Sequence, residues 1–100
     1  MRKATKQLSI SRKVKEAAYR RDGGYCVLCG SPYGLPNAHY IARSQGGLGI
    51  EENVVTLCEQ CHWEYDQSYK RKALREKLRA YLQNNYPDWD ERKLIYRKGM

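Results

Sequence analysis

This chain of 100 residues lacks several features that would assign it to common protein classes. It has no run of 18 apolar residues, which excludes a membrane-spanning helix, so we expect no membrane contact. Its first ten residues, MRKATKQLSI, contain no apolar stretch of the kind that a secretory signal carries. We therefore expect a cytoplasmic protein with reduced cysteines rather than a secreted, disulfide-bonded one.

Phenylalanine is absent and there are only two histidines, whereas tyrosine occurs nine times. Because 30% of the residues are charged, the core is expected to be thin. One hundred residues suffice for one small domain and are too few for two cores. We expect a flexible basic N-terminus over residues 1–10 and a single domain over residues 11–100. A chain this short and polar gains much folding free energy from a bound metal.

Acidic residues are scarce, and the formal net charge is +8. Residues 1–21 hold eight Lys or Arg against one Glu, and residues 70–79 hold six against one. Between them, residues 22–69 contain a single basic residue, Arg43, and six acidic ones. Two positive flanks around a neutral-to-acidic centre favour a nucleic-acid partner. A basic face that serves only solubility is the alternative.

The four cysteines form two identically spaced pairs, Cys26 with Cys29 and Cys58 with Cys61. Two cysteines three residues apart on a tight turn direct both thiolates at one ion, and a second pair completes a tetrahedral site. Gly30, directly after the first pair, suits the left-handed backbone that such a turn often needs. The pattern therefore predicts a structural zinc ion bound by four cysteines.

Apolar periodicity predicts helices in three parts of the chain. The first covers residues 11–21 and ends at Asp22-Gly23-Gly24. Another begins after Cys61, and the stretch 69–83 carries an apolar stripe among basic residues. Since Ser68 can cap a new helix, one continuous helix and two separate ones are both compatible with the sequence.

Two short strands are expected over residues 37–42 and 53–57, and the second is rich in β-branched residues. Three glycines make the connecting segment, residues 43–50, a flexible loop. The tail near Trp89 and Leu94 is apolar enough to pack back onto the domain. These elements predict a small α+β fold with flanking N- and C-terminal helices.

The only two histidines, His39 and His62, lie between or beside the cysteine pairs, and Asn53 opens the second strand. Because the metal joins the outer ends of this stretch, we expect the three residues to lie in one neighbourhood. A histidine as general base, an amide that orients it and a histidine on a divalent metal suit metal-assisted phosphodiester hydrolysis.

The segments CVLCG, AHYIARSQGG, EENVVTLCEQCH and WEYD together resemble the HNH endonuclease family. The resemblance covers roughly residues 19–66. It implies a ββα-metal core within a four-cysteine zinc frame, followed by a basic C-terminal helix and tail over residues 67–100. Small free-standing members of this family are frequent in phages and prophages, some of them beside DNA-packaging genes.

The resemblance assigns His39 as the residue that activates water, Asn53 as the residue that holds the loop, and His62 as a ligand of the catalytic metal. The family commonly has Asp or His before the general base as a second ligand, whereas this sequence has Ala38, which cannot coordinate a cation. Asp66, four residues after His62 and on the same helix face, is our candidate for that ligand. Asn37 is a weaker one.

In an alternative assignment, His39 is the metal ligand and Tyr40 acts at the reacting centre, although an ordinary tyrosine pKa near 10 suits a base poorly. We expect Tyr65 and Tyr69 to lie in the core rather than to stack on bases, and both tryptophans to belong to the core or to a subunit contact. Phosphate contacts supply most nonspecific affinity for DNA. The candidates for them are Arg43, Lys70, Arg71 and Arg75.

These features predict a DNA endonuclease that nicks one strand, has little sequence specificity, and depends on a divalent cation such as Mg²⁺, Mn²⁺, Ni²⁺ or Zn²⁺. The resemblance implies DNA and a phage terminase or other packaging protein as partners, a monomer or homodimer, and the host cytoplasm if a phage encodes the chain. A non-catalytic, zinc-stabilised nucleic-acid-binding module is the alternative that Ala38 favours. A zinc ribbon for protein interactions would leave the charge of +8 unexplained.

Overall fold

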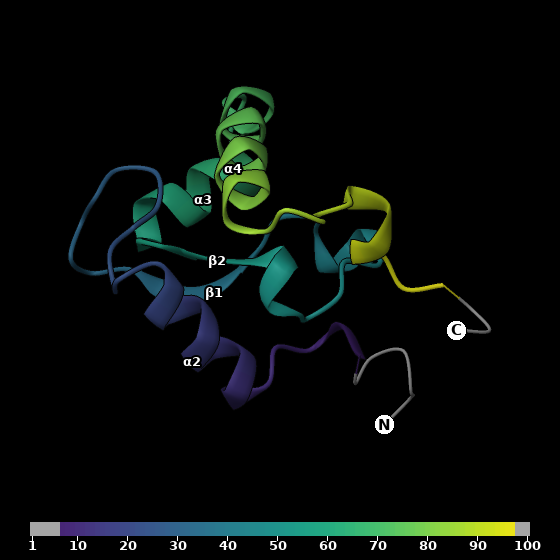
Figure 1. Cartoon of the computed structure of the whole chain (residues 1–100). Coiled ribbons are helices and arrows are strands. Elements are labelled where there is room, and N and C mark those ends of the chain that lie inside the picture. The colour runs from purple at the N-terminus through teal and green to yellow at the C-terminus, as the bar shows by residue number, and fades with distance from the viewer. Residues whose placement is uncertain (1–6, 98–100) are drawn as a thin grey trace.

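The structure, a computed structural model, describes residues 7–97. Its main elements are α2 (Arg12–Arg21), β1 (Leu35–His39), β2 (Val54–Leu57), α3 (Glu59–Gln67) and α4 (Arg71–Asn85). Short 3-10 turns cover Arg43–Gln45, Glu51–Asn53 and Glu91–Leu94. α2 lies on one side of the two-stranded sheet, and α3 and α4 lie on the other (Figure 1). This arrangement confirms the predicted small α+β class.

The helices begin and end at residues that satisfy their free backbone groups. Ser11 caps α2 by accepting a hydrogen bond from Val14 N at 3.2 Å, and Asp22 ends it as expected. Ser68 adopts an extended backbone conformation, and its hydroxyl accepts a hydrogen bond from Lys70 N at 3.1 Å. The chain therefore forms two helices, α3 and α4, rather than one continuous helix.

The strands β1 and β2 are antiparallel, with Ala38 opposite Val55 and His39 opposite Val54. The first strand ends at His39, three residues earlier than predicted, because the side chain of Asn53 replaces its next partner. Tyr40 N still donates to Asn53 O at 2.7 Å, but Ile41 N donates to the side-chain Oδ1 of Asn53 at 2.8 Å. The chain therefore leaves the sheet directly after His39.

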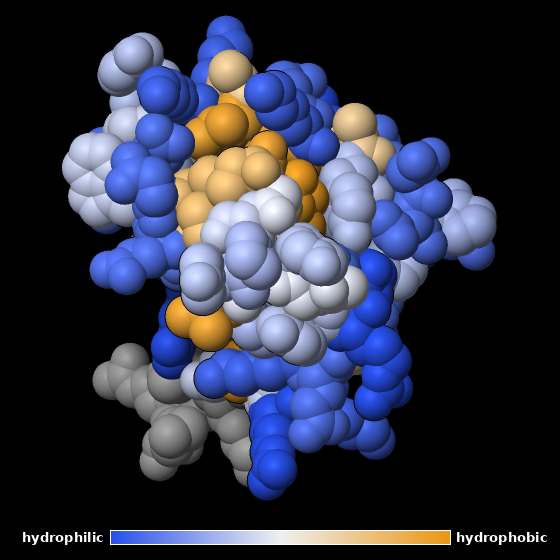
Figure 2. Space-filling model, turned by 90° about the vertical axis from the view of Figure 1, so that its left-hand side faces the viewer, coloured by the Kyte–Doolittle hydropathy of each residue, from blue (hydrophilic) through white to orange (hydrophobic). Residues whose placement is uncertain are grey.

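Side chains from the two strands, α3, α4 and the C-terminal tail meet in one core, in which Leu57, Tyr65, Leu78 and Leu82 are almost fully buried. Burial of each such side chain stabilises the fold by about 1.5–3 kcal/mol. The C-terminal tail packs back as predicted, since Leu94 is also buried and its carbonyl accepts from Leu48 N at 2.8 Å. Figure 2 shows a further apolar patch on one face of the molecule, enclosed by hydrophilic residues.

The aromatic residues divide between the core and the surface. Tyr65 is fully buried, and Trp89 contacts Tyr40 edge-on at 5.6 Å between ring centroids. Tyr69, however, is 91% exposed, and Trp63 is 57% exposed. The prediction that Tyr69 lies in the core is therefore wrong, because this residue falls in the break between α3 and α4.

Arg21 joins α2 to the sheet and to the C-terminal half of the chain. Its guanidinium donates to the carbonyls of Glu51 at 2.7 Å and Val54 at 2.6 Å, and it pairs with Asp22 at 2.7 Å. The same Asp22 carboxylate accepts from Thr56 N at 2.9 Å. Charge-assisted bonds of this kind are stronger than neutral ones, so the network orients α2 against the sheet.

Part of the predicted flexible N-terminus is in contact with the domain. Gly49 N donates to the carbonyl of Gln7 at 3.0 Å, and Arg43 donates to the hydroxyl of Ser9 at 3.1 Å. Residues 1–6 lie outside the described residues. Within residues 7–97, no helix combines the length and apolar character that crossing a bilayer requires.

Candidate metal centre and reaction cleft

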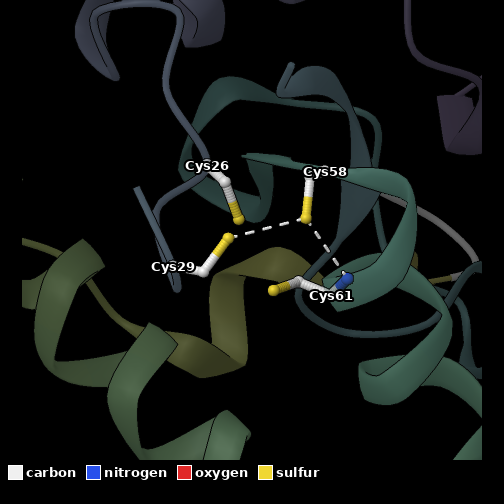
Figure 3. Close-up of side chains that lie close together, drawn as sticks. All are labelled: Cys26, Cys29, Cys58 and Cys61. Atoms are coloured by element: carbon white, nitrogen blue, oxygen red, sulfur yellow. Dashed lines mark hydrogen bonds between the residues drawn. The ribbon is translucent and has the colours of Figure 1, made fainter. Parts of the chain in front are cut away.

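The four cysteines converge on one point between the loop that follows α2 and the first turn of α3 (Figure 3). Their sulfur atoms all lie within 4.8 Å of one another. Cys58 caps α3, since its sulfur accepts from Cys61 N at 3.5 Å. Gly30 has a φ of 80°, the left-handed backbone expected after the first pair. The cluster is therefore a metal site of four thiolates.

The spacing of the sulfurs fits the size of a zinc ion. A tetrahedral ion with Zn–S bonds of about 2.3 Å holds its sulfurs about 3.8 Å apart. The sulfurs of Cys29 and Cys58 are 3.6 Å apart. Burial favours the neutral thiol of Cys26, but hydrogen bonds from surrounding backbone N–H groups outweigh it and lower the pKa of Cys26 to about 7. The lower pKa of Cys26 favours its thiolate, the form that binds a metal, whereas burial and the neighbouring cysteine thiols raise the pKa of Cys61.

Beside the cysteines, α3 and the loop after β1 enclose an open cleft of about 460 Å³. The cleft brings together most of the residues to which the sequence assigned chemistry. It is lined by Asn37, His39, Arg43, His62, Asp66 and Arg71. Two histidines, a carboxylate and two arginines thus share one concave surface, which is the usual form of a reaction site.

His39 stands at the end of β1 and is half-buried in the cleft wall. Its Nε2 lies 2.8 Å from the carbonyl oxygen of Leu8. Burial lowers the pKa of His39, the hydrogen bond to Leu8 opposes this, and the positive charge of Arg43 lowers the pKa further. The lowered pKa favours the neutral imidazole at pH 7, which is the form that a general base requires.

Asn53 is fully buried and does not line the cleft. Its amide nitrogen donates to the carbonyls of Ile41 at 3.2 Å and Leu48 at 2.8 Å, and its amide oxygen accepts from Ile41 N. One side chain thus joins the start and the end of the loop 41–48, which begins two residues after His39. This geometry is what a residue that holds the loop requires.

His62 and Asp66 are neighbours on the exposed side of α3. The Nε2 of His62 lies 3.1 Å from the carboxylate of Asp66, as expected for residues four apart on a helix. Within residues 7–97, only the four cysteines gather three or more His, Cys, Asp or Glu ligand atoms closely enough to hold an ion. His62 and Asp66 are thus two candidate ligands at an open cleft, with no third group of this kind beside them among the described residues.

The four candidate phosphate contacts divide into two groups. Arg43 and Arg71 line the cleft, and Arg71 is held in place by donating to Tyr65 O at 3.0 Å. Lys70 pairs with Glu64 at 3.1 Å, and Arg75 pairs with Glu91 at 3.0 Å, both outside the cleft lining. The structure thus brings two of the four to the cleft.

Tyr40 does not belong to the cleft. Its side chain is fully buried, and its hydroxyl donates to Glu91 at 2.6 Å. Burial, together with the carboxylate of Glu91, raises the pKa of Tyr40. The structure therefore disfavours the alternative in which Tyr40 acts at the reacting centre.

Sequence reasoning missed three polar residues of the cleft lining, Ser44, Gln45 and Gln67, and the carbonyl of Leu8 beside His39. Ser44 and Gln45 could have been found from their place between His39 and the glycine pair. Gln67 could have been found from its place one residue after Asp66. A backbone carbonyl 31 residues before His39 leaves no signal in the sequence.

The fold and the two sites define a class, a small α+β domain with a four-thiolate metal centre beside a cleft that carries two histidines. The HNH endonuclease family matches residues 26–67. Among curated proteins, Anaredoxin from Nostoc sp. strain PCC 7120 is similar, with 31% identity over 55 residues that make up 54% of this chain and 72% of that protein. The chain belongs to the HNH endonuclease family.

Proposed function

We propose that this protein is a divalent-metal-dependent DNA endonuclease that nicks one strand and has little sequence specificity of its own. The observation that carries the proposal is the shared cleft of His39, His62 and Asp66, in which Arg43 and Arg71 also lie. One such cleft within residues 7–97 provides for cutting one strand at a time. Specificity would then come from DNA shape or from a partner.

In this proposal, His39 is the general base that takes a proton from the attacking water. Two observations support the role, its position in the cleft wall and the lowered pKa that keeps its ring neutral. Asn53 acts indirectly, because its three hydrogen bonds fix the loop that begins directly after Tyr40. Removal of its amide would displace His39 and Arg43 together.

His62 and Asp66 would hold the divalent cation, for which Mg²⁺, Mn²⁺, Ni²⁺ and Zn²⁺ are the candidates. When bound, such an ion supplies a Lewis acid for phosphoryl oxygens. The imidazole of one and the carboxylate of the other, 3.1 Å apart at the cleft, are chemically suited to it. Arg43 and Arg71 would hold the DNA phosphates, and Lys70 and Arg75, which form ion pairs elsewhere, would contribute less.

We assign zinc to the four-cysteine site, with a structural role. Four thiolates fill a tetrahedral coordination shell and leave no position for water or substrate. The site joins the loop after α2 to the first turn of α3, which carries His62. Zinc would thus set the position of the cleft without taking part in the reaction.

The test is a supercoiled-plasmid nicking assay with purified protein and each of the four cations, with His39→Ala beside the wild type. We expect nicking that requires added cation and that His39→Ala loses while its zinc content and circular dichroism stay unchanged. Full activity in His39→Ala would contradict the catalytic assignment.

A second candidate is a non-catalytic, zinc-stabilised module that binds nucleic acid. The observation that favours it is Ala38, which is fully buried and places no ligand before His39. This module would bind DNA in a salt-sensitive way with no added divalent cation and would not cleave it under any of the four. The plasmid assay therefore separates the two functions.

The family resemblance supports the remaining parts of the proposal. It suggests action on DNA in the cytoplasm, of a host cell if the chain is phage-encoded, together with a phage terminase or another packaging protein. A single cleft of this kind in the described part of the chain is compatible with a monomer that nicks or a homodimer that cuts both strands. Co-purification with the terminase and analytical ultracentrifugation would test these two points.

A further inference from the structure

We propose that the N-terminal segment, residues 7–10, is part of the reaction site, because the carbonyl of Leu8 holds His39 in one tautomer. The role of the tautomer in cleavage rests on the function proposed above, whereas the tautomer itself does not. The family match begins at residue 26, so this segment lies outside the motif that the HNH family shares with this chain.

The hydrogen bond between Nε2 of His39 and the carbonyl of Leu8 is 2.8 Å long. A carbonyl oxygen only accepts, so in the neutral ring the proton must reside on Nε2. This leaves Nδ1 as the basic nitrogen of His39. A ring free to exchange tautomers would present a basic Nδ1 only part of the time.

Residues 7–10 are held in place by contacts with the glycine-containing loop, residues 43–50, and not only by their covalent link to α2. Gly49 N donates to Gln7 O at 3.0 Å, and a Cβ at Gly49 would lie 2.1 Å from the carbonyl oxygen of Ser9. Only a glycine therefore permits this close approach. Arg43 Nη2 donates to the hydroxyl of Ser9 at 3.1 Å, so one segment contacts both the base and an arginine of the cleft.

The position of the segment in the chain agrees with this role. It precedes α2, which the Arg21 network orients against β2, and it appears as the purple stretch that enters α2 in Figure 1. From there it reaches the end of β1 at His39, 31 residues further along the chain. Leu8 is therefore a positioning residue that acts through its backbone carbonyl, whatever its side chain.

The test uses Gly49→Ala in the full-length, zinc-loaded chain, since the added methyl group displaces the segment. Imidazole ¹⁵N–¹H correlation spectra at pH 7.5 report the tautomer directly. We expect Nε2–H alone for His39 in the wild type and a mixture of tautomers in Gly49→Ala, with the His62 signals unchanged. Leu8→Met, which keeps the carbonyl, is the matched control and should retain the wild-type tautomer.

If Gly49→Ala fails to fold, a second variant with two glycines inserted after Ile10 is used. The insertion shifts the carbonyl of Leu8 and leaves the core sequence unchanged. In either displaced variant we expect kcat for nicking to fall roughly 10- to 100-fold with little change in KM. An Nδ1–H tautomer in the wild type, or an unchanged tautomer in a folded displaced variant, would overturn the inference. Because the spectra need no turnover, a wild type that does not cleave would count against the proposed function alone.

Discussion

α3 carries residues of both the four-cysteine site and the proposed cation site, and the two sites differ in how closely their side chains gather. The four cysteine sulfurs lie within 4.8 Å of one another, and two of these cysteines, Cys26 and Cys61, are buried. His62 and Asp66 are partly exposed and lie at a cleft of about 460 Å³. One group is closed around a single point and the other is open.

Under the proposed function, this difference separates a site that stabilises the fold from a site that carries out the chemistry. A closed shell of four protein ligands contributes its binding free energy to the fold and excludes substrate. An open pair binds an ion less tightly but leaves coordination positions for water and a phosphate. Variants of residues in each of the two sites test this separation.

Cys58→Ser should have the largest effect. A serine keeps the cap of α3 but removes one thiolate, so we expect the zinc to be lost together with more than about 5 kcal/mol of stability, which is comparable to the whole stability of a small domain. Metal analysis and thermal unfolding followed by circular dichroism measure both. Glu59→Gln, at the exposed next position, is the control and should keep zinc and fold.

His39→Ala should reduce nicking by about 10²- to 10⁴-fold, the usual contribution of a general base. Since His39 lies at the end of a strand and not in the core, its zinc content and melting temperature should stay close to those of the wild type. A parallel loss of zinc would mean that the open site and the closed site are not separate.

Asn53→Asp tests how the open site is held. The carboxylate cannot donate to the carbonyls of Ile41 and Leu48, so we expect a loss of roughly 2–4 kcal/mol of stability together with weaker nicking. Chemical unfolding at fixed zinc concentration measures the first effect. Asn84→Asp, at the exposed end of α4, is the control and should change neither.

Asp66→Asn should weaken the binding of the catalytic cation and leave the zinc in place. We expect the cation concentration for half-maximal nicking to rise about 10- to 100-fold, with kcat partly recovered at saturation. Asp88→Asn makes the same change at an exposed site outside the cleft lining and should not shift the titration. An unchanged titration in Asp66→Asn would remove this residue from the ligand set.

Arg71→Gln and Lys70→Gln form a neighbouring pair with the smallest expected effects. Arg71 lines the cleft, so its loss should raise the KM for DNA roughly 3- to 10-fold and lower the salt slope of binding by about one phosphate. Lys70 pairs with Glu64 outside the cleft lining, so Lys70→Gln should stay within about twofold of the wild type. Equal effects would show that charge, and not position, matters.

Local signals in the sequence predict much of this molecule. The cysteine spacing predicts the four-thiolate site, Asp22 with its two glycines predicts the end of α2, and Ser68 indicates the break between α3 and α4. The helix end and the helix break depend on residues within a few positions of each other. The metal site depends on a spacing of four cysteines that suits tetrahedral coordination of one ion. The expected neighbourhood of His39 and His62 follows from the same pattern.

Long-range contacts could not be predicted in this way. The position of Tyr40 directly after His39 suggests a place in the cleft, but its hydroxyl donates a hydrogen bond to Glu91, 51 residues away. The carbonyl of Leu8 reaches His39 from a segment whose composition suggests flexibility. Such partners depend on how the elements pack, and neither composition nor spacing encodes that packing on its own.

The most direct test of the separation between the closed four-cysteine site and the open site of His62 and Asp66 is to remove metal from one protein sample and to follow zinc, fold and activity in it. The protein is dialysed against EDTA, its zinc content and circular dichroism are measured, and plasmid nicking is assayed before and after Mg²⁺ or Mn²⁺ is added back. We predict one retained zinc per chain, an unchanged fold, and nicking that is lost with EDTA and restored by the added cation. A protein that keeps its zinc and its fold but that no added cation activates would contradict the proposed open cation site.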